Sequence, residues 1–250
     1  MPRFFVKSEQ ITDKEITIIG EDVKHIKNVL RKQVGESIEI CNQETGKTYK
    51  CEIFELKEQE IINQIIQEIE VQEDRIKVDI YQGLPKAEKM ELIIQKSVEL
   101  GVNSIIPVEM KRCVVKIDAK SENKKIERWQ KIAESAAKQS GRNTIPEVHK
   151  IMKIEQIVNL KDTYDSIIVC YENEKETTLK SQLLKLKEQI LNKEKIKIAV
   201  VIGPEGGLEE KDVEYLKENG AQIVTLGNRI LRTETVALNI LSIIMYELEN

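Results

Sequence analysis

The chain has 250 residues, of which 40% are hydrophobic and 33% charged, and its formal net charge is −4 at pH 7. No apolar run reaches the roughly 18 residues that a membrane span needs, and the N-terminus lacks the apolar region of a signal peptide, so we expect a cytoplasmic protein with no membrane partner. The four cysteines and two histidines show no metal-ligand spacing, which argues against a metal site or a His-dependent triad.

The first 70 residues are rich in predicted strands. The strand-like segments are residues 3–6, 16–19, 37–42 and 48–56, and the isoleucines of residues 60–71 favour one more. A Glu44-Thr45-Gly46 turn predicts a hairpin, and residues 21–30 have a helical pattern. Small β-barrels of this kind often bind nucleic acid. We expect His25 to be packed, and Cys41 and Cys51 to be buried thiols because disulfides are rare in the cytosol.

From residue 76 the pattern alternates between strands and helices, which indicates an α/β domain with a parallel sheet. Strands are expected at residues 76–81, 104–108, 166–171 and 196–202, and helices at 87–100, 123–140 and 178–191. The charged Glu73-Asp74-Arg75 reads as a linker. We therefore place one domain at residues 1–72 and a second at residues 73–250, which this chain length accommodates.

A glycine-rich turn follows the last long strand. Residues 198–202 are continuously apolar, as in a strand buried on both faces of a parallel sheet. Gly203, Gly206 and Gly207 then allow the main chain to approach a ligand closely. The turn lacks the Gly-Lys-Ser/Thr ending of a phosphate loop, and Glu205 and Leu208 stand where a dinucleotide motif needs glycine. It is either a ligand turn at the carboxyl edge of the sheet or a plain strand-to-helix turn.

A second turn favours the ligand. After a short apolar strand ending at Leu226-Gly227, residues 228–235 place two arginines, a glutamate and two threonines before a nearly all-apolar helix, which we expect to be central. Thr233 or Thr235 as N-cap, and Glu234 beside the helix dipole, explain part of this pattern. They do not explain Arg229 and Arg232, because cations are disfavoured at the positive end of a helix. The arginines predict an anionic partner.

The two turns together resemble the RsmE family. Its members are SPOUT-class methyltransferases that methylate N3 of a uridine in 16S ribosomal RNA with S-adenosylmethionine. The two turns that carry the resemblance are residues 203–207 and 226–235, and further matching segments are residues 2–5, 25–31, 86–91, 95–102, 128–129 and 136–142. Segments matching in order along the whole chain make the resemblance specific.

The resemblance implies a PUA-like β-barrel RNA-binding domain at residues 1–72 and a SPOUT α/β-knot methyltransferase domain at residues 73–250. It also implies a deep trefoil knot in the C-terminal segment, although nothing in the residue spacing indicates one. The implied assembly is a homodimer with its active sites at the subunit interface. The implied partner is 16S ribosomal RNA or the small ribosomal subunit.

By the same resemblance, S-adenosylmethionine lies against the two turns, with the residues after an earlier strand as a third wall. The implied cofactor-binding residues are Tyr171, Glu172, Ile202, Gly203, Pro204, Gly206, Gly207, Leu226, Gly227, Arg229, Ile230, Leu231 and Thr235. The candidate catalytic residues are Arg232 and Glu234. Since N3 of uracil must lose a proton and arginine is no base, Arg232 is expected to stabilise the uracil anion. Glu234 is a candidate proton acceptor, with solvent as the alternative.

Charge and arginine usage locate the expected RNA contacts. Residues 75–160 carry 17 Lys+Arg against 11 Asp+Glu, whereas residues 1–74 carry 10 against 16 and residues 161–250 carry 12 against 16. A polyanion is expected at the basic middle segment. Arginine supplies a planar fork that lysine lacks, and most of the 8 arginines, among 31 lysines, fall in the resembling segments. The expected RNA-binding residues are Arg3, Arg31, Lys86, Lys89, Lys96, Arg128, Gln139 and Arg142.

Two other functions remain open on the sequence alone. A SPOUT methyltransferase acting on transfer RNA or on another ribosomal nucleotide would share the glycine turns, but is not expected to share Arg3, Arg31 and residues 139–142. A non-catalytic RNA-binding or ribosome-assembly protein would need RNA and no cofactor.

Overall fold

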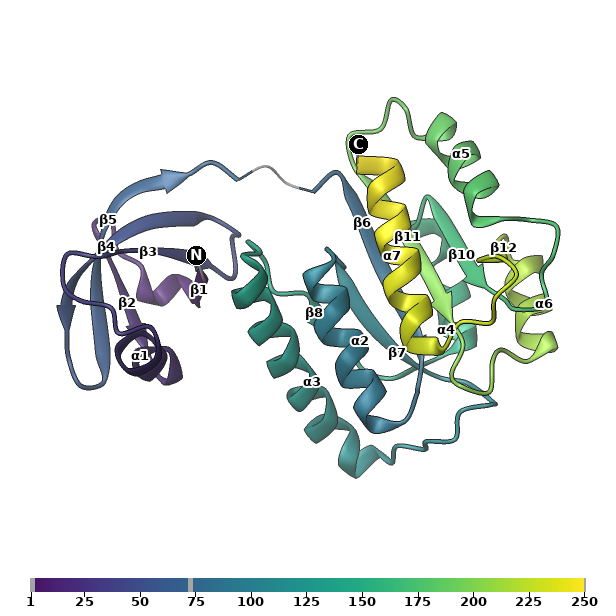
Figure 1. The fold of residues 1–250 in the computed structure, drawn as a ribbon, viewed down its shortest axis with the longest axis horizontal. Coiled ribbons are helices and arrows are strands. Elements are labelled where there is room, and N and C mark those ends of the chain that lie inside the picture. Colours follow the sequence, from purple (N-terminus) through teal and green to yellow (C-terminus); the bar gives the residue numbers. More distant parts are fainter. Residues whose placement is uncertain (1–2, 72–73, 250) are drawn as a thin grey trace. The chain divides into compact units, whose positions relative to one another are not determined.

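The computed structural model describes residues 3–71 and 74–249. Figure 1 shows two compact units, each with its own sheet. One unit comprises Met1–Glu73 and Glu134–Ile145, and the other comprises Asp74–Ala133 and Pro146–Asn250. No helix in the described ranges is both long and apolar enough to cross a bilayer.

The first unit is built on a curled five-stranded sheet with the strand order β1-β3-β4-β5-β2. Its strands are β1 (Arg3–Val6), β2 (Glu15–Ile19), β3 (Ser37–Asn42), β4 (Thr48–Leu56) and β5 (Glu60–Ile69), as predicted. Isoleucines from all but one strand meet in the core. Cys41 and Cys51 are buried free thiols, as predicted, because strand pairing sets them opposite Thr48 and Ile38.

The helix predicted at residues 21–30 is interrupted. α1 (Glu21–Lys24) passes into a π-helical turn (His25–Val29), and Arg31 after it has a φ of 53°, in the left-handed region. The expectation that His25 is packed is wrong. Val23 and Ile26 take the buried positions of this segment, which leaves His25 exposed with its ring centroid 6.3 Å from that of Phe4.

The second unit contains a parallel sheet, which confirms the predicted α/β class. Its strand order is β12-β10-β11-β6-β7-β8, and β9 also pairs with β7. The strands are β6 (Ile76–Gly83), β7 (Ser104–Glu109), β8 (Glu147–Val148), β9 (Met152–Lys153), β10 (Ser166–Cys170), β11 (Ile196–Ile202) and β12 (Gln222–Val224). β11 lies between β10 and β6, helices pack on both faces of the sheet, and residues 198–202 of β11 are accordingly apolar on both faces.

Helices cover both faces of this sheet. On one face α4 (Ile154–Val158) and α6 (Glu210–Glu218) contribute to a core with a row of residues that crosses five strands: Ile106, Tyr81, Val201, Val169 and Ile223. α7 (Thr233–Glu249) packs against β6 and β11, with α2 (Ala87–Glu99) and α5 (Leu179–Gln189) beside it (Figure 1). α3 (Ala119–Ser140) runs through both units.

The expectation that α7 is central is wrong. α7 forms part of an outer layer, and its buried apolar residues form one stripe: Ala237, Ile240, Leu241, Ile244 and Leu248. Tyr246, which lies outside this stripe, is 71% exposed. The apolar residues outside the stripe therefore remain partly open within one chain.

Candidate active site

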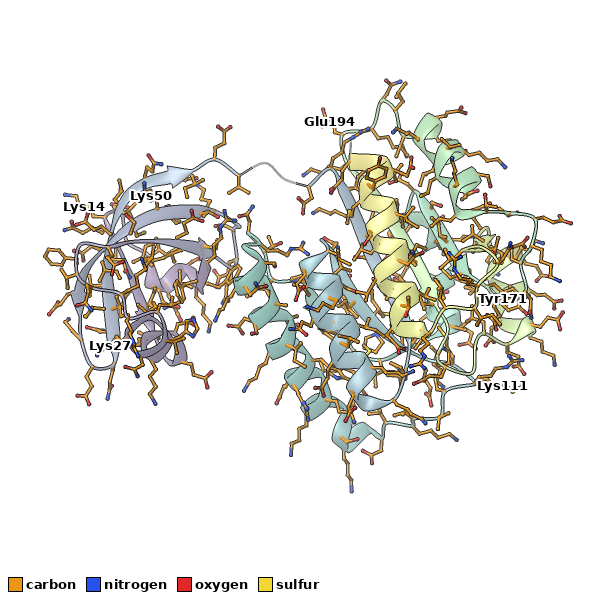
Figure 2. All side chains as sticks on the ribbon, in the orientation of Figure 1. Lys14, Lys27, Lys50, Lys111, Tyr171 and Glu194 are labelled. Carbon is orange, nitrogen blue, oxygen red and sulfur yellow. The ribbon has the colours of Figure 1, made fainter. Side chains whose placement is uncertain are left out.

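Three segments of the second unit meet at one edge of its sheet. Because β10, β11 and β12 are parallel, their carboxyl ends lie together. Residues 171–172 follow β10, the first glycine turn (203–207) follows β11, and the second glycine turn (226–235) follows β12 and ends in the first residues of α7. Tyr171, labelled in Figure 2, donates its backbone N–H to Val224 O at 3.1 Å. The two predicted turns and the predicted third wall are therefore neighbours.

The glycines of the first turn are needed by the protein's own packing. A Cβ on Gly203 would lie 2.9 Å from the carbonyl carbon of Gly207, and one on Gly206 would lie 2.9 Å from the carbonyl oxygen of Arg112. Gly207 has a φ of 72°, and Glu172 Oε1 occupies its side-chain space. At these three positions the space expected for a ligand is filled by the chain itself.

Gly227 in the second turn has different surroundings. Its φ is 107°, and no heavy atom lies within 4 Å of the position of a Cβ. Ile230 nearby is 88% exposed, which is unusual for an apolar side chain. Arg229 and Arg232 are exposed and make no salt bridge with a described residue. An open main chain, an exposed apolar side chain and unpaired cations suit a ligand with an apolar part and a carboxylate.

A buried hydrogen-bond tie joins the first glycine turn to α7. Thr233 Oγ1 donates to Gly203 O at 2.7 Å and accepts from Gln82 Nε2 at 2.9 Å. Gln82 is fully buried at the end of β6, and the next residue, Gly83, has its side-chain space filled by Pro204 and Met110. Thr233 is the first residue of α7, and its hydroxyl joins this helix to the first glycine turn and to the end of β6. Gln82 and Gly83 could not be found by sequence reasoning, because this tie depends on tertiary contacts.

A salt-bridge tie, formed by Glu205, Lys89 and Glu234, joins the same elements. Lys89 Nζ lies 3.1 Å from Glu234 Oε2 and 3.4 Å from Glu205 Oε1, and the backbone N–H of Lys86 donates to Glu205 Oε1 at 3.2 Å. Burial alone would raise the pKa of Glu205, but backbone hydrogen bonds and Lys89 outweigh it and lower that pKa. Lys89, expected at the RNA, is held by two carboxylates, and Glu234 already has a cationic partner.

The remaining predicted RNA-binding residues are scattered. Arg3 donates to Glu39 Oε2 at 2.7 Å, to Gly141 O at 2.6 Å and to Asn143 Oδ1, so it holds residues 141–143 within the first unit. Arg128 and Lys96 form salt bridges with Glu91 and Glu99. Arg31 and Lys86 are exposed and form no described salt bridge, and Gln139 is exposed as well. Arg142 is half-buried.

One arginine near the site was missed. Arg112 Nη1 donates to Gly206 O at 3.2 Å, and its own carbonyl packs against the same glycine. Arginine is scarce in this lysine-rich chain, so the choice of arginine at position 112 could have marked it as a candidate functional residue. Within the described residues, no group of three His, Cys, Asp or Glu side chains is placed to hold a metal ion.

Comparison with known proteins matches this chain over its whole length. A family model described as an RNA methyltransferase domain matches residues 72–245, and one described as an RNA methyltransferase PUA domain matches residues 18–66. Ribosomal RNA small subunit methyltransferase E of Bacillus subtilis is 39% identical, covering 100% of this chain and 98% of the relative. The protein of the same name from Aquifex aeolicus is 32% identical, covering 90% of this chain and 91% of the relative.

A solved structure agrees with these matches. Ribosomal RNA small subunit methyltransferase E from Neisseria gonorrhoeae, bound to S-adenosyl methionine, superposes with a TM-score of 0.82 at 29% identity. The match covers 98% of this chain and 97% of that one.

Proposed function

The chain belongs to the ribosomal RNA small subunit methyltransferase E family, and on that premise we propose that it methylates N3 of a uridine in 16S ribosomal RNA. It is an RNA methyltransferase that uses S-adenosylmethionine. The observation in its own structure that best supports the proposal is the meeting of the two glycine turns, tied by the hydrogen bond from Thr233 Oγ1 to Gly203 O. The turns meet where ligands bind in open parallel sheets.

The residues at this edge fit the cofactor. S-adenosylmethionine supplies the methyl group as an electrophilic sulfonium. The open main chain at Gly227 and the apolar Ile230 and Leu231 would hold its nucleoside part. Arg229 has no described carboxylate partner and would bind the methionine carboxylate. Glu172, which borders Gly207, completes the third wall. Such residues act mainly by fixing donor and acceptor in near-attack geometry.

Arg232 and Glu234 have separate proposed roles in catalysis. Arg232 is exposed and unpaired among the described residues, so it is free to stabilise the uracil anion that forms when N3 loses its proton. Glu234 either accepts that proton or, paired with Lys89 at 3.1 Å, only orders the start of α7 while solvent takes the proton. A Glu234→Gln variant separates these roles, because only proton acceptance predicts a large rate loss with a flattened pH profile.

The domain and assembly proposals follow the family. We propose a PUA-like RNA-binding domain at residues 1–72, a SPOUT methyltransferase domain with a trefoil knot at residues 73–250, and a cytoplasmic homodimer. Partly open apolar residues on α7, which packs beside α2, support a dimer interface there. A crystal structure with an unknotted C-terminal segment, or with α7 facing solvent in the assembly, would contradict the knot or the interface.

A transfer assay tests the function. Purified protein, methyl-labelled S-adenosylmethionine and small ribosomal subunits from a strain lacking this enzyme are expected to give labelled 16S ribosomal RNA. Arg232→Lys is expected to lower the single-turnover rate, since an ammonium does not reproduce the planar fork, while cofactor affinity stays unchanged. Absence of label with wild-type protein would contradict the methyltransferase function on this substrate.

A further inference from the structure

Residues 111–116 form a short segment, here called the ledge, that is fixed against the first glycine turn. It follows β7, where the backbone N–H of Cys113 donates to Met110 O at 3.0 Å and that of Met110 to Cys113 Sγ at 3.3 Å. Met110 Sδ lies 2.7 Å from the Cβ position of Gly83, and Arg112 O lies 2.9 Å from that of Gly206. The ledge is therefore positioned by its main chain and by Met110 and Cys113.

The outward side chains of the ledge are mostly cationic. The side chain of Lys111, which is labelled in Figure 2, is 67% exposed and pairs with Glu209 at 2.8 Å. Lys116 is exposed and has no described salt bridge, and Val114 is 71% exposed. The Arg112 guanidinium is exposed and spends one N–H on Gly206 O, which leaves most of its donors without a described partner.

We propose that the ledge binds the RNA backbone, with the Arg112 guanidinium contacting a phosphate beside the first glycine turn. The proposal rests on the proposed function, because it takes RNA as the substrate. Among the described salt bridges the three cations have one carboxylate partner, Glu209, and Asp212 also lies near Lys111 and Arg112, so the ledge keeps an excess of positive charge that complements a polyanion. In a chain that uses lysine for most positive charges, an arginine here supplies the fork that phosphate oxygens match.

The main chain of Arg112 packs on Gly206, whereas its side chain is the proposed phosphate contact, so a side-chain variant tests the proposal. An Arg112→Ala variant keeps the carbonyl that packs on Gly206, so its affinity for S-adenosylmethionine is expected to stay within about twofold of wild type. Its affinity for unmethylated small subunits is expected to fall about tenfold, and the slope of log affinity against log salt to decrease by about one, as for one lost phosphate contact. Arg112→Lys is expected to keep the slope and recover part of the affinity.

The matched control removes one positive charge at the opposite edge of the sheet. Lys185 on α5 lines a polar hollow with Asp165, Ser166 and Gln222, where β10 and β12 begin. Lys185→Ala is expected to leave binding of both RNA and cofactor unchanged. Thermal melts of each variant, together with Arg112→Gln, confirm that the fold is kept.

Two results would overturn the proposal. The first is an Arg112→Ala variant that still transfers methyl groups and whose RNA affinity and salt slope equal those of wild type. This result would leave the proposed function intact. The other is an equal loss of cofactor and RNA affinity, which assigns the guanidinium to the glycine turn. If the wild-type protein itself transfers no methyl group to the subunits, the proposed function fails instead.

Discussion

Gly227 is needed for its backbone conformation and, we propose, for the space that it leaves to the cofactor. Gly220 shares the backbone conformation but lies outside the site, so variants at the two glycines separate these roles. Gly227 and Gly220 have φ angles of 107° and 95°, and neither has a heavy atom within 4 Å of its Cβ position. Gly227→Ala and Gly220→Ala are each expected to cost about 1 kcal/mol or somewhat more, from backbone strain alone. Only Gly227→Ala is expected to weaken S-adenosylmethionine binding, measured by calorimetric titration. Equal cofactor affinity in both variants would contradict the assignment of Gly227.

Gly206 in the first turn packs against the ledge. A Gly206→Val substitution would place a side chain in the turn where the cofactor is proposed to bind. The Arg112 carbonyl lies 2.9 Å from the Cβ position, however, so the added side chain displaces the ledge as well. Its effect on the cofactor is therefore not separable from its effect on Arg112.

A buried carboxylate at the other end of the sheet controls stability rather than chemistry. Asp79 is 2% exposed and accepts hydrogen bonds from Asn103 at 2.6 Å, Ser104 at 2.6 Å and Tyr164 at 2.9 Å, with Lys197 Nζ at 3.2 Å. Burial alone would raise its pKa, but these hydrogen bonds and the lysine outweigh burial and lower the pKa. Every group in the cluster has a partner, which indicates a structural role.

The lowered pKa of Asp79 predicts an acid-sensitive contribution to stability. Asp79 stabilises the fold above its unfolded-state pKa of about 3.9, and this stabilisation is lost as the pH falls through the lower folded-state pKa. At neutral pH, Asp79→Asn is expected to cost about 2–4 kcal/mol, because Lys197 loses its partner and one donor faces the amide nitrogen. Urea titrations should show a smaller acid dependence in the variant. An identical acid dependence would contradict this role.

At the level of single residues, sequence patterns predicted the candidate site but not its contacts. Gly203 to Gly207 and Gly227 to Arg232 stood out because glycines and paired arginines are unusual after buried strands. Gln82 was not found, since a glutamine at a strand end is not informative until Thr233 is known to be its neighbour. Lys89 was expected to bind RNA because it lies in the resembling segment 86–91. Its two carboxylate partners come from distant parts of the chain and could not be predicted.

At the scale of elements, Lys89 joins α2, the first glycine turn and α7, and its replacement distinguishes this tie from an RNA contact. Lys89→Met leaves Glu205 and Glu234 without their cation, so the two turns are expected to separate and cofactor affinity to fall several-fold. Lys89→Arg is expected to restore most of it. Parallel titrations with cofactor and with small subunits measure both affinities. Loss of RNA affinity with full cofactor affinity would show that Lys89 binds RNA instead.

Most elements were predictable because their apolar patterns follow from burial on one or both faces. β11 is covered on both sides and is continuously apolar over residues 198–202, whereas β4 has one exposed face and alternates. α7 was predicted to be central because it is apolar on nearly every face, but within one chain only one stripe is buried. The sequence does not indicate which chain covers the remaining apolar residues.

At the scale of the whole molecule, the division into units was harder to predict. Residues Glu134–Ile145 belong to the same compact unit as the N-terminal sheet, and Arg3 and Asp22 contact this segment through Gly141 and Lys138. The helical pattern of α3 continues without a break across this division. A periodicity that depends only on local burial therefore cannot reveal that the two ends of one helix belong to different units.

The proposed homodimer gives a prediction for the assembled molecule. Sedimentation velocity at micromolar concentration is expected to show a dimer, because the partly open apolar face of α7 needs a partner. A charge placed on α7 at Ile243, which is half-buried, is expected to weaken the dimer and lower methyl transfer. A fully active monomer would contradict the placement of the active site at a subunit interface.

The central claim is that this chain methylates N3 of a uridine in small-subunit ribosomal RNA. The most direct test is mass spectrometry of nucleosides from 16S ribosomal RNA of a strain lacking the enzyme, before and after the purified protein and S-adenosylmethionine are added to its small subunits. The account predicts that N3-methyluridine is absent before and appears at one position after. A methyl group on carbon 5 or on the ribose, or no new methylated nucleoside, would contradict it.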